Sequence, residues 1–295
     1  MSTTAGPVLE FVNVERTHGA GARAVRVLGP VDLAVAVGEL VAIMGPSGSG
    51  KSTLLALAGA LDRPTAGTVS IGGRDLAGMS PTELAALRRR TIGYVFQDLN
   101  LLPGLNALEN VALPLELDGR SMATARAEAR DALERVRLGH CAARFPDDLS
   151  GGEQQRVAIA RAFVGPRTLL LADEPTGALD SVAGELVLRE LRALCDAGRS
   201  SLLVTHDATH AAWADRVLYL RDGALDARTP PENVAEIAAG FPKHAHVVAS
   251  SAGHESIERL DPGYRALQID FLHGRPVQSR TLQLPPVRFR PLAGR

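Results

Sequence analysis

The chain has 295 residues, which is enough for one large domain or two of modest size. Its 32 basic and 33 acidic residues leave a formal charge of −1, which argues against a protein that holds nucleic acid by neutralising phosphates. The two cysteines, Cys141 and Cys195, lack metal-ligand spacing, so we expect reduced thiols in a cytoplasmic protein. We find no secretory signal pattern and no apolar stretch near the ~20 residues that span a bilayer. Work at a membrane would therefore need a partner that supplies the spanning part.

Short apolar runs alternate along the chain with segments of helical spacing, a pattern that predicts an α/β sandwich. Several of the runs are apolar enough to be buried on both faces of a sheet. The predicted strands are Val8–Val14, Leu40–Met44, Thr68–Ile71, Ile92–Phe96, Leu169–Ala172, Ser201–Thr205 and Val217–Leu220. The predicted helices are Thr53–Leu61, Pro81–Arg90 with a capping box at Ser80, and Ala123–Leu138.

The domain organisation follows from the gaps in this pattern. Residues 98–150 contain no convincing strand, and we predict a helical subdomain there. The composition changes after Arg228, where prolines, histidines and arginines become scattered. We therefore predict one domain at residues 8–228 and a C-terminal extension at residues 229–295. Within the extension we expect a short helix at Asn233–Ala239 and a strand at Arg265–Leu272; its role as a partner-binding or regulatory appendage, or as a poorly ordered tail, stays open.

A glycine-rich segment between the predicted strand Leu40–Met44 and an apolar helix matches the P-loop pattern. Its glycines let backbone N–H groups converge on phosphate oxygens, and the helix adds its positive end. We expect Lys51 to reach the β- and γ-phosphates and the Ser52 hydroxyl to bind Mg²⁺. Alone, the loop would suit a GTPase, a kinase or many ATPases. The predicted nucleotide-binding residues here are Gly45, Pro46, Ser47, Gly48, Ser49, Gly50, Lys51, Ser52 and Thr53.

Two carboxylates end the apolar run at Leu169–Ala172. Because an unpaired buried charge is costly, a buried strand seldom ends in paired acids without a reason. At the carboxyl edge of the sheet, Asp173 would hold Mg²⁺ through water, and Glu174 would orient or deprotonate the attacking water. The alternative is that the acids merely cap a loop before Pro175, which the P-loop makes less favoured.

The segment Leu149–Glu153 reads LSGGE. Ser150 is expected to be an N-cap and Glu153 to complete a capping box for an apolar-faced helix. Gly151 and Gly152 weaken a helix start, yet they leave bare N–H groups at its positive end where a phosphate can approach. A capped helix without a ligand would not explain the two glycines.

LSGGE lies between GPSGSGKS at residues 45–52 and ADEP at residues 172–175, and this combination resembles an ABC transporter nucleotide-binding domain. The resemblance covers about residues 8–228. It implies an α/β fold of the P-loop NTPase ABC type, with a mixed sheet core and a helical subdomain, followed here by the C-terminal extension. It also implies an ATPase that uses ATP and Mg²⁺.

The resemblance assigns further residues one by one. Gln97 matches the Q-loop glutamine that contacts Mg²⁺ and the attacking water, and His206 matches the switch histidine on the γ-phosphate. Asp180, in Ala178-Leu179-Asp180, matches the loop that crosses the dimer interface. Relatives stack adenine on an aromatic residue near the start, where this chain offers His18, with Val25 sharing the role. The implied catalytic set is Lys51, Gln97, Glu174 and His206, and the implied metal set is Ser52, Gln97 and Asp173.

In this family ATP lies between the P-loop of one subunit and the LSGGE segment of the other, here Ser150, Gly151, Gly152 and Glu153. Because one chain carries both half-sites, we expect a homodimer. We also expect an integral-membrane permease as partner, contacted through Leu99, Leu101, Leu102 and Leu105, and a position at the cytoplasmic face of the membrane.

The phrasing around Leu61–Gly67 and Leu87–Gln97 resembles the lipoprotein-releasing and macrolide-efflux branch of these ATPases. Three alternatives stay open: a cell-division ATPase of the same branch, a soluble non-transport ABC ATPase acting on DNA, and a nucleotide sensor with little turnover. The second is disfavoured because the chain has neither zinc-binding cysteine clusters nor a long coiled coil between Lys51 and Ser150. Glu174 and His206 speak against the third.

Overall fold

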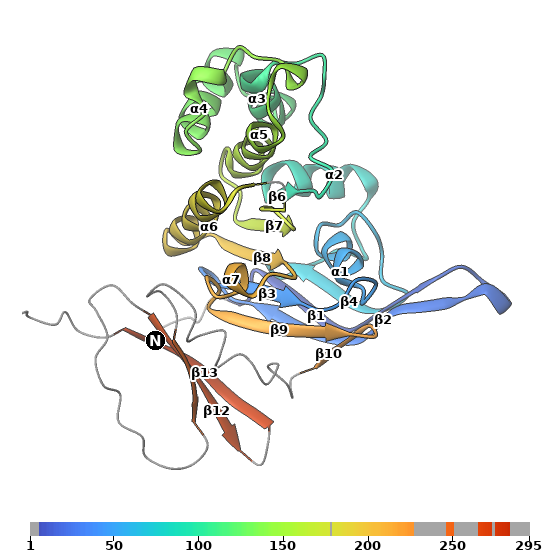
Figure 1. Cartoon of the computed structure of the whole chain (residues 1–295). Helices are drawn as coiled ribbons and strands as arrows, with labels where there is room; N and C mark the ends of the chain where they lie inside the picture. The colour runs from blue at the N-terminus through green and yellow to red at the C-terminus, as the bar shows by residue number, and fades with distance from the viewer. Residues whose placement is uncertain (1–5, 178, 227–245, 251–264, 273–274, 284–295) are drawn as a thin grey trace, which may run out of the picture. The chain divides into compact units, whose positions relative to one another are not determined.

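The computed structural model describes residues 6–177, 179–226, 246–250, 265–272 and 275–283. The chain divides into two compact units, Met1–Asp226 and Ala227–Arg295. Figure 1 follows the chain through both, and each unit is described by itself below. The described residues include no helix that is both long and apolar enough to cross a membrane.

The first unit contains two sheets. The antiparallel sheet has the order β2-β1-β4-β5 and consists of β1 (Leu9–His18), β2 (Val25–Val35), β4 (Ala66–Ile71) and β5 (Arg74–Asp75). The second sheet has the order β10-β9-β3-β8-β7-β6 and is parallel apart from β10. Its strands are β3 (Leu40–Met44), β6 (Ile92–Val95), β7 (Leu169–Asp173), β8 (Ser200–Val204), β9 (Arg216–Arg221) and β10 (Ala224–Asp226).

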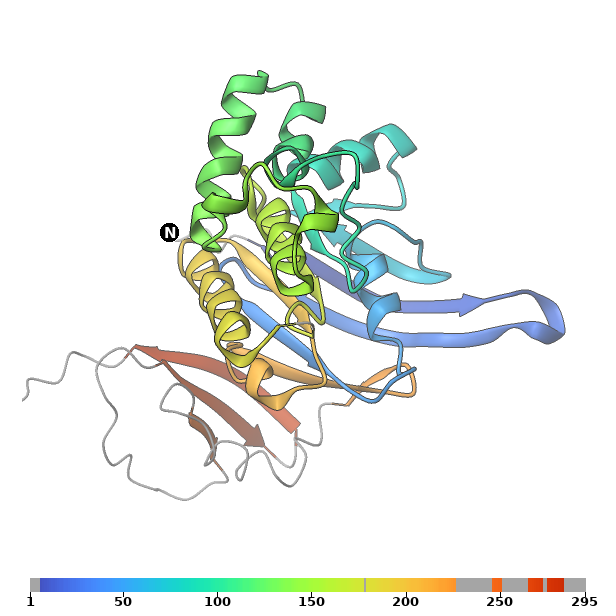
Figure 2. The same cartoon turned by 45° about the horizontal axis from the view of Figure 1, so that its top comes forward.

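Helices cover the parallel sheet on both faces. The α-helices are α1 (Lys51–Ala58), α2 (Pro81–Arg90), α3 (Ala107–Leu117), α4 (Met122–Arg135), α5 (Gly151–Phe163), α6 (Ser181–Asp196) and α7 (Ala208–Ala211). Three 3-10 turns are η1 (Gly21–Arg23), η2 (Gly139–Cys141) and η3 (Pro146–Asp148). The predicted capping box at Ser80 is confirmed at the start of α2. In Figure 2 α3, α4 and α5 form a separate helical group, and β1 and β2 extend beyond the other strands as a hairpin.

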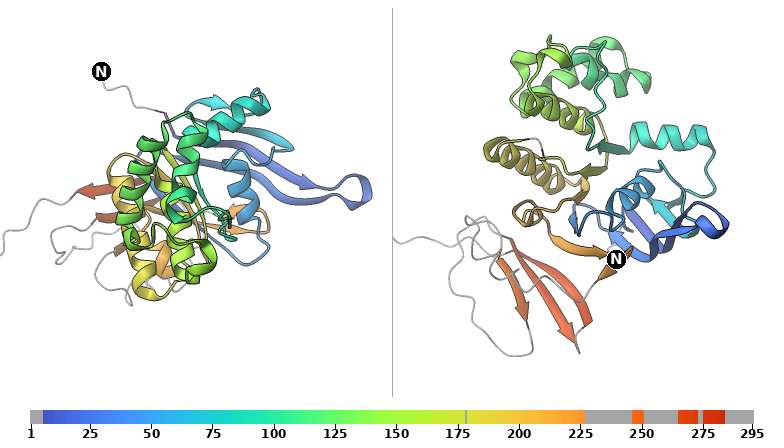
Figure 3. Two further views of the ribbon diagram at one scale, coloured as in Figure 1. Left: turned by 90° about the horizontal axis from the view of Figure 1, so that it is seen from above. Right: turned by 45° about the vertical axis from the view of Figure 1, so that its right-hand side comes forward.

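Strand β7 shows how the parallel sheet separates two cores. Leu169 and Leu171 pack with α1 and the β1–β2–β4 strands, whereas Leu170 and Ala172 face the helices α3 to α6. Every residue of β7 is buried. This confirms the prediction of strands buried on both faces, because successive side chains of a strand point to opposite faces. Figure 3 shows the helical group on the opposite side of this sheet from the β1–β2 hairpin.

Strand β2 is the main element that the sequence pattern did not predict. Gly29-Pro30 interrupts its apolar run and is typical of a turn. In the structure the strand continues through this dipeptide, and Leu28, Val31 and Leu33 are buried against β1 and β4. Pairing with β1 on a covered face therefore overrides the local signal. The short strands β5 and β10 were also missed.

The second unit contains a three-stranded sheet of β11 (His246–Ser250), β12 (Arg265–Leu272) and β13 (Arg275–Gln283). Strand β12 pairs parallel with β11 and antiparallel with β13. The predicted strand at Arg265–Leu272 is confirmed. The predicted helix at Asn233–Ala239 lies outside the described residues.

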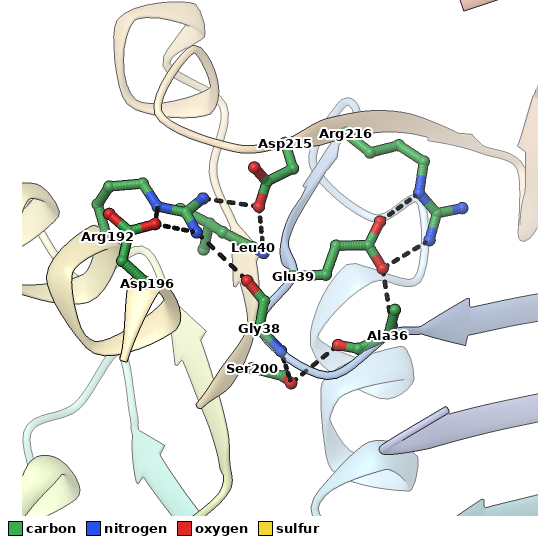
Figure 4. A network of polar contacts seen from close by, with 9 residues as sticks. All are labelled: Ala36, Gly38, Glu39, Leu40, Arg192, Asp196, Ser200, Asp215 and Arg216. Atoms are coloured by element: carbon green, nitrogen blue, oxygen red, sulfur yellow. Dashed lines mark hydrogen bonds and ion pairs between the residues drawn. The ribbon is translucent and has the colours of Figure 1, made fainter. Parts of the chain in front are cut away.

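A polar network fixes the amino ends of the parallel strands (Figure 4). The Asp215 carboxylate accepts hydrogen bonds from the Leu40 N–H at 2.8 Å and from Arg192 Nη1 at 2.6 Å. Nearby, the Ser200 hydroxyl donates to the Ala36 carbonyl and accepts from the Gly38 N–H. These contacts set the starts of β3 and β8, whose other ends carry the site described next.

We predict that Asp215→Ala lowers the free energy of unfolding by about 3 kcal/mol, because it removes a largely buried charge partner of Arg192 and leaves the Leu40 N–H without its acceptor. Urea denaturation of the purified chain measures this. Glu185→Ala is the matched control, since its ion pair with Arg189 is exposed and is worth less than about 1 kcal/mol. Equal losses in the two variants would contradict the stabilising role of the network.

Candidate functional site

The glycine-rich loop at residues 45–50 connects β3 to α1 and is enclosed by backbone. A Cβ added to Gly45 would lie 2.1 Å from the Leu220 carbonyl oxygen of β9. Gly50 has φ +105°, and a Cβ there would lie 2.8 Å from the Val27 carbonyl oxygen of β2. Only glycine fits such close backbone approach. Strands β9 and β2 therefore hold the loop from two sides.

Inside the loop, the Lys51 ammonium donates to the carbonyl oxygens of Gly45 and Pro46, at 2.8 and 2.9 Å. These bonds place a positive charge at the point where the loop closes. The Ser49 hydroxyl is buried without a hydrogen-bond partner among the described residues. A buried hydroxyl without a partner is costly, and an oxygen-rich ligand would satisfy it.

Asp173 ends β7 beside this loop and is only 8% exposed. Burial raises the pKa of the Asp173 carboxyl, and the negative charge of Glu174 acts in the same direction. A hydrogen bond with the Ser52 side chain and the charge of Lys51 lower that pKa, but the net direction is upward. The carboxylate thus lies where an additional positive charge would stabilise it.

Glu174 follows with φ 48°, a left-handed conformation that is uncommon outside glycine. Its carboxylate is held by the end of β8: Thr205 Oγ1 donates to Oε2 at 3.4 Å, and His206 Nδ1 lies 2.8 Å from Oε1. The hydrogen bond and then the charge of Glu174 raise the pKa of His206. The His206 side chain is 77% exposed, so a ligand can reach it.

The P-loop and the carboxylates meet because β3, β8 and β7 are parallel neighbours whose carboxyl ends share one edge of the sheet. The structure thus brings together five predicted site residues: Lys51, Ser52, Asp173, Glu174 and His206.

The oxygens at this edge fit a magnesium ion. Ser52 and Asp173 are already hydrogen-bonded to each other, and Asp173 has a desolvated carboxylate. Hydroxyl, carboxylate and amide oxygens are hard donors, which Mg²⁺ prefers. Gln97, the third predicted ligand, lies just after β6 with an exposed side chain.

The LSGGE segment forms a second, separate cluster. The predicted capping box of α5 is confirmed: Ser150 Oγ accepts from the Glu153 N–H at 3.3 Å, and Glu153 Oε2 accepts from the Ser150 N–H at 2.9 Å. These bonds lower the pKa of Glu153. Ser150 and Gly151 are exposed, and no atom would contact a Cβ at Gly151 within 4 Å. Within the described residues, neither Ser150 nor Glu153 contacts the P-loop.

The other predicted residues lie as follows. His18 and Val25 are partners in the register of β1 and β2, and both are exposed, Val25 by 62%. Asp180 is the N-cap of α6, where its Oδ1 accepts from the Ala183 N–H at 2.8 Å. Ala178 is outside the described residues.

Sequence reasoning missed two residues that hold the site. Thr205 was treated as part of a strand, but its hydroxyl bonds Glu174. The buried Gln155 side chain of α5 donates to the Pro175 carbonyl, directly after the two acids. No local pattern marks either contact, because each joins segments that are distant in the sequence.

The fold and this sheet edge define a P-loop nucleotide-binding domain. The chain belongs to the ABC transporter family, whose family model, described as "ABC transporter", matches residues 28–177. The resemblance and the fold class expected from the sequence are thereby confirmed. Two solved dimeric structures of the ATP-binding cassette MJ0796, one in a post-hydrolysis state bound to ADP and Pi, match with TM-score 0.71 and 43% identity. They cover 74% of this chain and 96% of the MJ0796 chain.

Curated relatives agree with this family. The macrolide export ATP-binding/permease protein MacB of Rhodospirillum rubrum is 48% identical over 225 residues, 76% of this chain but 35% of that protein. The chain therefore spans about a third of the length of such relatives. The MacB protein of Azoarcus sp. is 42% identical over 268 residues, a match that must extend into the second unit. The uncharacterized ABC transporter ATP-binding protein YknY of Bacillus subtilis is 45% identical over 74% of this chain and 95% of its own length.

We predict that Glu174→Gln lowers the pKa of His206, because the substitution removes both the charge and the carboxylate acceptor that raise it. Titration of the His206 ring by NMR in the nucleotide-free protein measures the change. Glu185→Gln, which neutralises an exposed glutamate paired with Arg189, should leave that pKa unchanged. A His206 pKa that is the same in wild type and Glu174→Gln would refute the pairing.

Proposed function

We propose that this chain is the ATP-binding and ATP-hydrolysing subunit of an ABC transporter, and that its ATP-dependent dimerisation drives a separate membrane permease. The observation that carries the proposal is the convergence of Lys51, Ser52, Asp173, Glu174 and His206 on one sheet edge. Phosphates would bind the loop amides, Lys51 and the N-terminus of α1. His18 and Val25 would contact adenine.

Glu174 is the base in this proposal. Its carboxylate would accept a hydrogen bond from water and take a proton as the water oxygen attacks the γ-phosphorus. In the nucleotide-free chain Oε1 is hydrogen-bonded to His206. His206 would have to turn from Glu174 to the γ-phosphate, which its exposure permits. The Thr205 hydroxyl would keep the carboxylate in place meanwhile.

Mg²⁺, held by Ser52, Asp173 and Gln97, would neutralise negative charge on the β- and γ-phosphates. Gln97 would also orient the attacking water. Asp173 would gain the positive charge that its raised pKa indicates it lacks.

Two copies of the chain would complete each site. The exposed amino end of α5, at Ser150–Glu153, has bare N–H groups and no partner phosphate in its own chain. Placed against the P-loop of a second copy, it would close on the γ-phosphate and exclude water, and Asp180 would lie at the interface. The dimeric MJ0796 cassettes support this arrangement, and a homodimer suffices because one chain carries both halves.

The permease is a separate partner in this proposal. The macrolide export relatives are named ATP-binding/permease proteins, which supports a transport system of that branch or of the lipoprotein-release type. Leu99, Leu101, Leu102 and Leu105 all retain some exposure, so they are available for contact with it. Such contact would hold the chain at the cytoplasmic face of the membrane.

Glu174→Gln tests the base. We predict that kcat for ATP hydrolysis falls by about a thousandfold while ATP binding persists and the dimer accumulates. A phosphate-release assay and size-exclusion chromatography with ATP measure both effects. Glu185→Gln should retain wild-type turnover and no trapped dimer. Wild-type hydrolysis by Glu174→Gln would show that Glu174 is not the base.

Ser150→Arg tests the paired site. We predict that the bulky cation at the exposed amino end of α5 reduces ATPase activity at least tenfold, by about 1.4 kcal/mol or more in activation free energy. Ser121→Arg is the matched control, since Ser121 also caps a helix from an exposed position, at α4. Each variant should lose about 1 kcal/mol of stability with its cap. If both variants lose activity equally, the end of α5 is not part of the site.

A further inference from the structure

Arg161, on the last turn but one of α5, binds the segment that follows Gln97. Its Nη1 donates to the Asn100 carbonyl oxygen and its Nη2 to the Leu99 carbonyl oxygen, both at 2.6 Å. Asn100 has φ 50°, an uncommon left-handed turn for a residue other than glycine. The two acceptors lie two and three residues beyond Gln97, so Arg161 fixes the backbone that carries this glutamine.

The charge of Arg161 has no obvious structural purpose. Burial lowers the pKa of its guanidinium, and it forms no salt bridge within the described residues. Arg167, close enough to lower its own pKa through the charge of Arg161, adds repulsion. A desolvated cation without a carboxylate is costly. The two carbonyl dipoles at Leu99 and Asn100 therefore provide its main compensation, and a strong, directional tie results.

The helix that carries Arg161 is itself firmly anchored. At its carboxyl end, Arg167 Nη1 donates to the Ala162 carbonyl at 3.2 Å, and Arg199 donates to the carbonyls of Phe163 and Gly165 at 2.7 and 2.9 Å. In the middle, Gln155 bonds Pro175. The helix therefore moves as one body, and Arg161 lies about 15 Å along it from Gly151, at 1.5 Å per residue.

We propose that Arg161 is a positioning residue that couples Gln97 to the Ser150 end of α5. This inference rests on the proposed function, in which Gln97 faces the ATP of its own subunit and Ser150 faces the ATP of the partner subunit. A shift of the segment at Leu99–Asn100 would be transmitted through the guanidinium to α5. Arg161 would thus connect the two nucleotide sites of the dimer.

The test compares Arg161→Gln with Arg199→Gln. Both arginines are half-buried, and each donates to two backbone carbonyls, but only Arg161 reaches the segment after Gln97. In the nucleotide-free protein, backbone ¹⁵N order parameters at residues 97–101 should drop from about 0.85 to below about 0.6 in Arg161→Gln alone. Unchanged order parameters in Arg161→Gln would overturn the proposal, whether or not the chain hydrolyses ATP.

Kinetics supply the second readout. Arg161→Gln should lower kcat by about a hundredfold, with the Kd for ATP within about twofold of wild type, because Gln97 is misplaced while the P-loop is intact. Arg161→Lys, which keeps a donor and the charge, should recover part of kcat. Equal kcat losses in Arg161→Gln and Arg199→Gln would assign Arg161 a purely structural role and sink the proposal. A wild-type chain without ATPase activity would instead refute the proposed function, leaving the order-parameter result to stand by itself.

Discussion

The parallel pairing of β3, β8 and β7 is the constraint on which the rest of the site depends. Each of these strands is nearly or fully buried, so their register is set by packing on two faces. Their carboxyl ends must then coincide at one edge. The loop after β3 supplies amides and Lys51, β7 supplies the acids, and the residues after β8 hold Glu174. The opposite edge is fixed by the network around Asp215.

Charge at the sheet edge is arranged around an unmet need. Two adjacent carboxylates, one of them desolvated, are compensated only in part by Lys51 and by hydrogen bonds from Ser52, Thr205 and His206. An arrangement that left out Mg²⁺ and phosphate would gain little from burying Asp173. The left-handed backbone at Glu174 belongs to the same picture, since strain of this kind persists where the surroundings over-determine a functional geometry.

Helix α5 connects this edge to the surface that a second copy would meet. Its amino end is exposed and capped by its own Ser150 and Glu153, so it needs no ligand to be stable. Its middle and carboxyl end are tied to Pro175 and to the segment after Gln97 by Gln155 and Arg161. One rigid element thus contacts two parts of the site in its own chain and presents a third part to a partner.

The sequence by itself determined the features that depend on neighbouring residues. Strand β3, the P-loop, the capping boxes at Ser80 and Ser150 and strand β12 each have a local pattern that the structure matches. Tertiary structure decided the rest. Strand β2 runs through Gly29-Pro30 because β1 and the core require it, and the contacts of Thr205, Gln155 and Arg161 join residues far apart in the chain. A local pattern cannot encode such contacts, because they exist only after the strands and helices have packed.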